Sequence, residues 1–450
     1  MATTALYRTL GTPTLGTKFT LSVWLKRSNP SSGSYEYIMS FDQGNNPRMH
    51  IRFNDSTDAL TWYTRDGSGT VNEYTTTRLF RDTNSWYHLV FAYDSTQGTA
   101  SNRQKIYVNG VQETNFTTES YVAQNYVAPL NTNGYLCKIS SFGDANYSHQ
   151  FSGIMYHFHF IDGTAYDAST FGSTDATTGE WKINTSQTMT MGDNGFTILK
   201  DGNTITDQSA NSNNWTLGGG TLTKTEDCPS NVFATLNPLA SLPNTGASTF
   251  TNGNTTSQGV NASYVNGGST LMMSSGKWYA EMKYVATSSA SRCIAGITQD
   301  VSEISRINQD SGSYNTFYVS SSGNKNIQNT NTSYGATWTT GDIIGIALDL
   351  DNNRLFFSKN GAWQNSGDPT SSTGAITGFD APASTLNGGY FFFSGSDSNA
   401  QNNTVSWNFG NGYFGTTQIT SAGTNASNIG IFEFDCPAGY TALSTKGLNE

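Results

Sequence analysis

The sequence predicts an all-β protein made of two antiparallel β-sandwich domains in tandem. Two observations predict this class: apolar and polar residues alternate over many short stretches, and Gly and Asn separate these stretches at short intervals. A third observation is compositional, because aromatic residues make up 13% of the chain while charged residues make up only 12%. Disordered chains are poor in large apolar side chains, so this composition indicates folded sheets.

The first half opens on a clearly alternating stretch, FTLSVWLK. It predicts a strand with one apolar face formed by Phe19, Leu21, Val23 and Leu25, and it leaves Trp24 on the more polar face. The stretch WYHLVFAYD carries apolar groups on both faces, which is typical of a central strand.

Two hairpins are predicted from their turns. In QKIYVNGVQ the pair Asn109-Gly110 readily adopts positive φ at both positions, so it predicts a tight turn between two short strands. The stretch GDIIGIALDLDNNRLFFSKNG predicts a longer hairpin that turns at Asp351. One face of its first strand is apolar and consists of Ile344, Ile346, Leu348 and Leu350.

The domain junction is expected just before residues 237–259, a stretch rich in Pro, Asn, Thr and Gly. This places one domain at residues 1–228 and the other at residues 229–450. The stretches EDCPSNVFATLNPL and FDCPAGYTALSTKGLN repeat each other near the two domain ends and contain Cys228 and Cys436. The two cysteines could form a redox or disulfide pair, but the sequence does not show whether they lie close together. We therefore favour the interpretation that each stretch is a strand end followed by Pro, which closes its domain.

Charge and composition exclude several classes of function. The chain has 33 acidic and 23 basic residues and no Lys/Arg cluster, so a nucleic-acid partner is not expected. It lacks a run of about 20 apolar residues, so membrane insertion is not expected. The start, MATTALYRTLGT, lacks the pattern of a signal peptide. Spacings typical of zinc, of phosphate loops and of nucleophile elbows are absent, so we expect no cofactor.

Motifs in the two halves of the chain resemble two known domain families. TLSVWLKR, SWYHLVFAYD, KIYVNGVQ and FSGIMYHFHFIDG resemble the laminin-G-like, concanavalin-A-like sandwich. GKWYAEM, AGIT and the long hairpin with its final SKNG resemble a SPRY domain, although the proline often found after the aromatic run is missing from GYFFFSG. The tandem is similar to structural or tail-associated proteins of marine bacteriophages, and this resemblance implies a virion protein made in the host cytoplasm.

Concanavalin-A-like sandwiches include glycoside hydrolases, so a secreted carbohydrate-active hydrolase is one alternative. A retaining hydrolase needs two carboxylates about 5 to 5.5 Å apart in one cleft. The nearest candidates are Asp349 with Asp351, and Glu433 with Asp435. The first pair flanks a hairpin turn and the second adjoins the Pro strand exit, so we interpret both as turn residues and predict no catalytic residue and no enzymatic activity.

Two places in the sequence carry residues that could bind a metal ion. His157 and His159 alternate in YHFHF and could hold zinc or copper, but a third ligand is missing, so we predict histidines that face outward or an interface. Asp42 and Asp144 follow strands and could bind calcium, as some laminin-G-like domains do at their rim. We favour turn formation for both, so no metal ligand is predicted.

Binding is the class that remains. The loop around Arg306, Asn308 and Tyr314 is the candidate ligand-binding site, because Asn and Tyr side chains suit sugars and protein partners equally. We therefore expect a non-enzymatic virion surface protein, either a capsid decoration or a tail-associated subunit. Its expected partners are other virion proteins, further copies of itself and a host-surface glycan. A tail fibre or receptor-binding adhesin is the alternative.

Overall fold

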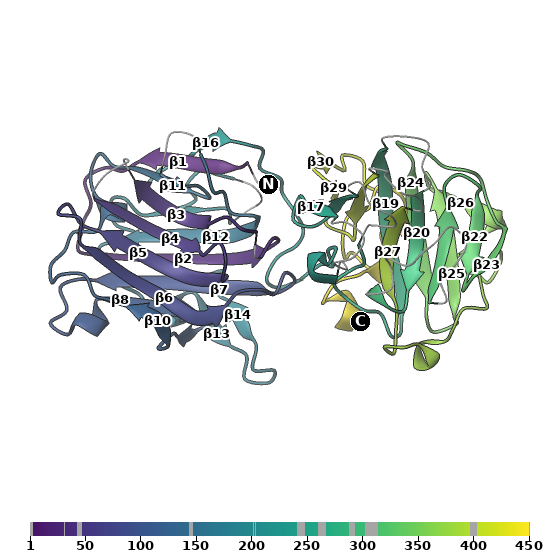
Figure 1. Ribbon diagram of the computed structural model, residues 1–450, viewed down its shortest axis with the longest axis horizontal. Helices are drawn as coiled ribbons and strands as arrows, with labels where there is room; N and C mark the ends of the chain where they lie inside the picture. Colours follow the sequence, from purple (N-terminus) through teal and green to yellow (C-terminus); the bar gives the residue numbers. More distant parts are fainter. Residues whose placement is uncertain are drawn as a thin grey trace. The chain divides into compact units, whose positions relative to one another are not determined.

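The computed structural model folds the chain into two compact units, residues 1–224 and 225–450 (Figure 1). Within the residues that it describes, it contains single 3₁₀ turns but no α-helix, and nearly all strand pairs are antiparallel, which confirms the all-β class. No helix there is long and apolar enough to cross a membrane. The described residues are 3–30, 32–42, 47–143, 147–200, 202, 204–240, 248–259, 267–287, 293–301, 314–396 and 403–449.

The first unit is built from two sheets and a short ribbon (Figure 1). Its first sheet contains, in spatial order, β10 (Phe116–Glu119), β6 (Val71–Leu79), β5 (Ala59–Arg65), β4 (Arg48–Phe53), β3 (Glu36–Asp42), β11 (Leu136–Ile139), β1 (Ala5–Thr9) and β16 (Thr216–Gly219). Its second sheet contains β15 (Phe196–Ile198), β12 (Gly153–Asp162), β2 (Lys18–Arg27), β7 (Trp86–Asp94), β8 (Gln104–Val108) and β9 (Val111–Gln112). The ribbon pairs β13 (Gly172–Thr174) with β14 (Trp181–Ile183).

The core of the first unit lies between its two sheets. The apolar face of β2 points into it as predicted, and Phe19 stacks on Tyr93 at 5.0 Å and on Phe160 at 5.3 Å. Burying one such side chain contributes about 2 kcal/mol. The predicted turn between β8 and β9 is also confirmed, because Asn109 and Gly110 have φ values of 47° and 82°.

The second unit also contains two main sheets. One has the order β17 (Thr249–Thr251), β18 (Thr256–Gln258), β28 (Thr404–Asn408), β19 (Lys277–Ala286), β24 (Ile343–Asp349), β25 (Arg354–Lys359) and β26 (Ala362–Trp363), with β31 (Thr441–Ala442) parallel to β19. The other has the order β23 (Thr330–Ser333), β22 (Asn324–Ile327), β21 (Asn315–Val319), β20 (Cys293–Thr298) and β27 (Phe391–Ser396). A small ribbon pairs β29 (Tyr413–Phe414) with β30 (Thr417–Gln418).

The long predicted hairpin is confirmed as β24 and β25, with Leu348 opposite Leu355 and Ile346 opposite Phe357. All four of these side chains belong to the core of the second unit. The apolar alternation therefore fixed both the register and the buried face of this hairpin.

Candidate functional site

The structure does not bring the three predicted loop residues together into a described site. Arg306 and Asn308 lie outside the described residues. Tyr314 is half-buried directly before β21, and its carbonyl oxygen accepts a hydrogen bond from the Gln299 N–H at 2.9 Å. This contact continues the pairing of β20 with β21 beyond Thr298 and Asn315.

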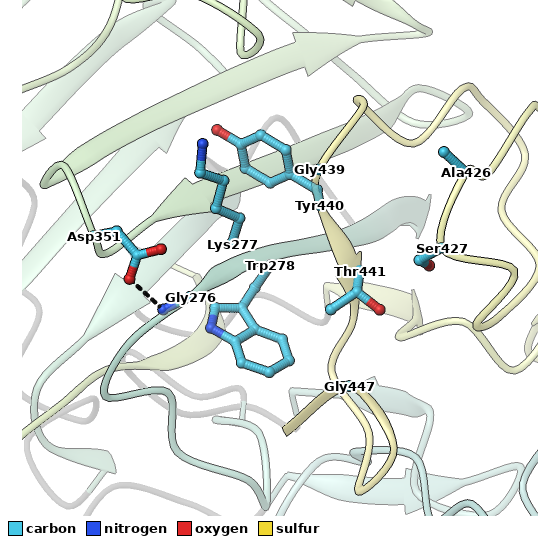
Figure 2. Close-up of a pocket in the computed structure, with 10 residues that line it drawn as sticks. All are labelled: Gly276, Lys277, Trp278, Asp351, Ala426, Ser427, Gly439, Tyr440, Thr441 and Gly447. Atoms are coloured by element: carbon cyan, nitrogen blue, oxygen red, sulfur yellow. Dashed lines mark hydrogen bonds between the residues drawn. The ribbon is translucent and has the colours of Figure 1, made fainter. Parts of the chain in front are cut away.

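A different place in the second unit forms an open pocket of about 410 Å³ (Figure 2). The start of β19, the turn between β24 and β25, and the C-terminal segment converge there. The lining residues are Gly276, Lys277, Trp278, Asp351, Ala426, Ser427, Gly439, Tyr440, Thr441 and Gly447. No local sequence pattern marks this pocket, because its residues are distributed over some 170 positions of the chain.

The hairpin turn forms one side of the pocket. Asp351 Oδ1 accepts a hydrogen bond from the Gly276 N–H at 2.7 Å, as Figure 2 shows. Asp349 accepts the Asn352 N–H at 3.0 Å and lies 3.3 Å from Lys277 Nζ. Asp349 thus stabilises the turn as interpreted, whereas Asp351 ties the turn to the residue before β19.

The opposite side combines an aromatic ring with a hydroxyl group. Trp278 is 4% exposed, and its indole N–H donates to the carbonyl of Ser275 at 2.6 Å, which holds the ring in the pocket wall. Thr441 Oγ1 is buried without a hydrogen-bond partner. A buried hydroxyl without a partner costs about 1–3 kcal/mol, and this one is closed to solvent. The groups that the pocket offers to a polar ligand are therefore the Lys277 ammonium and the Asp351 carboxylate, beside a nearly buried ring.

The two repeated Asp-Cys-Pro stretches lie against each other beside this pocket. Phe233 bridges Ser444 in antiparallel orientation, and the Ala234 N–H donates to the Leu443 carbonyl at 2.9 Å. Cys228 and Cys436 are both free thiols. The repeat therefore pairs through its backbone, and no disulfide links the two cysteines.

Glu281 anchors the second Asp-Cys-Pro stretch to β19. Its carboxylate accepts the backbone N–H groups of Glu433 and Phe434, each at 2.8 Å. Asn408 Nδ2 and the Tyr279 hydroxyl donate to it at 3.1 and 3.2 Å. Burial raises the pKa of Glu281 to about 7, although the hydrogen bonds favour the ionised form.

The remaining predicted acids near the chain end also have structural roles. Asp435 Oδ1 accepts the Thr424 N–H at 2.6 Å, and hydrogen bonds from Thr424 lower the pKa of Asp435. Glu433 contributes its N–H to Glu281. This pair therefore holds the C-terminal segment in place, in agreement with the interpretation as turn residues.

In the first unit, Ser22 and His88 form a buried pair. Ser22 Oγ lies 2.9 Å from His88 Nε2, and the Trp181 indole N–H donates to His88 Nδ1 at 3.0 Å. An indole N–H can only donate, so Nδ1 accepts and the neutral ring carries its proton on Nε2. That nitrogen donates to Ser22 and cannot take the hydroxyl proton, so the pair lacks the arrangement of a nucleophile and its base.

The same face of the second sheet is sealed by aromatic rings. The His88 ring stacks on Trp24 at 4.7 Å and on Trp181 at 5.9 Å. Burial lowers the pKa of His88 to about 3, and likewise that of His159. Trp24 does lie on the face away from the core, but that face is covered by the ribbon that contains Trp181.

The predicted outward orientation of His157 and His159 is wrong, because each is only 2% exposed. A bulge in β12, with His157 at φ 48°, interrupts the alternation on which the prediction rested. Among the described residues, no three His, Cys, Asp or Glu side chains are placed to hold a metal ion. Asp42 lies 3.4 Å from both Arg48 and His50, and Asp144 lies outside the described residues.

Comparisons with known proteins identify both segments. Residues 3–136 match the concanavalin A-like lectin/glucanases superfamily, and residues 277–377 match the SPRY domain. No curated protein matches the chain.

Three solved structures show low overall similarity. The SPRY domain of human HERC1 is 16% identical, with 38% of this chain and 96% of that domain covered, at a TM-score of 0.29. A heptameric SAP-like pentraxin from Limulus polyphemus is 15% identical, with coverages of 44% and 89% and a TM-score of 0.29. A candidate carbohydrate binding protein from Bacteroides ovatus is 20% identical, with coverages of 50% and 60% and a TM-score of 0.30.

The two family matches fall in different compact units, one before residue 224 and the other after residue 225. The chain therefore combines a concanavalin A-like lectin/glucanase (laminin G) domain with a SPRY domain.

Proposed function

We propose that this chain is a non-enzymatic binding protein of a bacteriophage particle, and that it engages carbohydrate or protein surfaces. The observation that carries the binding function is the combination of a lectin-like domain and a SPRY domain in one chain. The pocket beside Trp278 supports it, because the ammonium of Lys277 and the carboxylate of Asp351 in its lining suit a polar ligand. The virion location rests on the resemblance of the tandem to structural proteins of marine phages.

The absence of catalysis is part of the proposal. Of the acids considered for glycoside hydrolysis, Asp349, Asp351 and Asp435 accept hydrogen bonds that fix the turn and the C-terminal segment, and Glu433 takes part through its backbone N–H. The Ser22–His88 pair has its proton on the wrong nitrogen for serine activation. A screen of polysaccharides with the full chain should give no products; turnover abolished by Asp349→Ala or Glu433→Ala would support the hydrolase instead.

The pocket is tested by a change of its ammonium group. Lys277→Gln removes the positive charge that lies 3.3 Å from Asp349, and we expect a loss of stability below about 1 kcal/mol because this ion pair is partly exposed. Ligands found on a glycan array or by pull-down of host envelope proteins should bind about tenfold more weakly. The control is Lys325→Gln on β22, a half-buried lysine of the same unit outside the pocket lining. Unchanged binding by Lys277→Gln would exclude the pocket as the contact surface.

The virion location needs intact particles. Mass spectrometry of purified virions should detect the chain, and antibody labelling should place it on the capsid or against other tail proteins. Its complete absence from purified particles would contradict the virion part of the proposal. Labelling at the tip of a long fibre would favour the adhesin over a decoration.

A further inference from the structure

Strands β3, β4 and β5 lie side by side in the first sheet of the first unit (Figure 1). Aromatic and cationic side chains gather on the outer face of these strands. We call this cluster the tyrosine–arginine patch. Tyr37 pairs with Arg52 across β3 and β4, and His50 pairs with Tyr63 across β4 and β5. Tyr35 precedes β3 and completes the patch. The intervening side chains of β4 and β5, such as Ile51 and Trp62, belong to the core.

Arg52 lies at the centre of the patch. Its guanidinium carbon is 4.3 Å from the ring centre of Tyr35, 5.6 Å from that of Tyr63 and 5.7 Å from that of Tyr37. One guanidinium nitrogen donates to the Tyr37 hydroxyl at 3.2 Å. The His50 ring stacks on Tyr63 at 5.4 Å, which supports that ring from the side. These contacts hold the guanidinium in one orientation before any ligand binds.

The charge of Arg52 is not balanced by a carboxylate in the part of the chain that the structure describes. The nearby Asp42 lies 3.4 Å from Arg48 and 3.4 Å from His50. Arg52 Nε is buried without a hydrogen-bond partner. Arg52, Tyr35 and Tyr63 are each half-buried, so part of each side chain is exposed to solvent. An oriented cation without a carboxylate partner among the described residues is therefore present on a chain whose net charge is −10.

We propose that the tyrosine–arginine patch binds an anionic carbohydrate. Arg52 pairs with a carboxylate or sulfate of the sugar, because its planar guanidinium matches such groups and is already oriented. The rings of Tyr35 and Tyr63 stack on the apolar face of the sugar. A neutral sugar would leave the charge unpaired, and the patch lies within the segment that matches the lectin/glucanase superfamily. This inference rests on the proposed binding function and names its ligand class.

The test is affinity electrophoresis and calorimetry of the full chain with alginate, chondroitin sulfate, dextran and poly-glutamate. The wild type should bind the uronate or the sulfated polymer, and binding should weaken as salt rises. Arg52→Gln should weaken it at least about tenfold, and Arg52→Lys should weaken it less, because it keeps the charge but loses the planar fork. Lys105→Gln on β8 is the charge-matched control and should bind like the wild type.

Each outcome separates this inference from the proposed function. Wild-type binding to acidic polymers that Arg52→Gln leaves unchanged would overturn the inference and leave the binding function intact. Preference for poly-glutamate over both acidic sugars would show that the ligand of the patch is an acidic protein and not a carbohydrate. If the chain bound no glycan and no host protein at all, both proposals would fail. If Arg52→Gln shifts the thermal transition of the first unit, Tyr63→Ala and Tyr63→Phe provide the test instead. Binding of the acidic polymers should be lost only in Tyr63→Ala, because Tyr63→Phe keeps the ring that stacks on the sugar.

Discussion

The two outer faces of the first unit contain similar residues and differ in what covers them. On the second sheet, His88 is enclosed between Trp24 and Trp181 and stays neutral. On the first sheet, Arg52 is surrounded by tyrosines but remains half-exposed and charged. A polar side chain that aromatic rings cover completely is thus buried and neutral. One that they cover only in part stays charged and is held in one orientation at the surface. The buried Glu281 of the second unit is the acidic counterpart of the sealed histidines.

The largest expected effect is that of acid on the sealed face. The pKa values of His88 and His159 fall to about 3 in the folded state, so the unfolded chain binds more protons between pH 6.5 and 3. Stability therefore decreases as pH falls below 6.5, by about 1 kcal/mol per pH unit for each histidine. Urea unfolding of the first unit at pH 6.5 and 5 should show a loss of about 3 kcal/mol. His159→Gln should halve the slope, and a flat profile would mean that solvent reaches these rings.

Removing the central ring of the sealed face should have the next largest effect. His88→Ala leaves a cavity between two indole rings and an unpaired Trp181 N–H, so we expect a loss of about 3 kcal/mol in the first unit. Thermal unfolding followed by tryptophan fluorescence measures it. The matched change at a surface-accessible histidine, His149→Ala, should cost less than about 1 kcal/mol. Equal effects would contradict the contrast between sealed and open surfaces.

Glu281 should give a pH response of the opposite sign in the second unit. Its folded pKa of about 7 lies above the ordinary value of 4.5, so the stability it contributes is present below pH 4.5 and is lost as pH rises through 7. Glu281→Gln should remove this slope and cost about 2 kcal/mol, because an amide group would face the donor groups of Glu433 and Asn408. Denaturant unfolding of the second unit at pH 5 and 8 provides the measurement. An unchanged slope would mean that another group titrates.

The smallest expected effect on stability is at the open face. Arg52→Gln should change the unfolding free energy of the first unit by less than about 1 kcal/mol, because a half-exposed cation–π contact contributes little. Calorimetric scans of the variant and of Lys105→Gln give the comparison. A loss above about 2 kcal/mol would place Arg52 with the sealed residues and weaken its role as a ligand-binding cation.

Much of the fold could be predicted from local sequence. Alternation identified β2 and its buried face, and it identified the apolar face of β24 in the hairpin with β25. The Asn109-Gly110 pair identified a turn because its conformation is intrinsic to those residues. These features depend on neighbours a few positions away, which the sequence displays directly.

The site could not be predicted in the same way. Trp24 and His88 are buried by Trp181, which lies nearly a hundred positions further along the chain than His88. The pocket joins Trp278 to Thr441, and no local pattern marks that contact. The structural role of Glu281 could have been predicted, because it is the one acid in the mainly apolar strand β19. Such an acid must be either paired or fully hydrogen-bonded.

The pairing of the two Asp-Cys-Pro stretches has a consequence for protein engineering. Because Phe233 lies opposite Ser444, a segment near the start of the second unit runs beside a segment near its end. A module with adjacent ends can be spliced into an exposed turn of an unrelated host protein at a small loop-closure cost. The same adjacency permits a circular permutant whose new ends lie in the turn between β29 and β30. The second unit is thus suited to transplantation as a self-contained cassette.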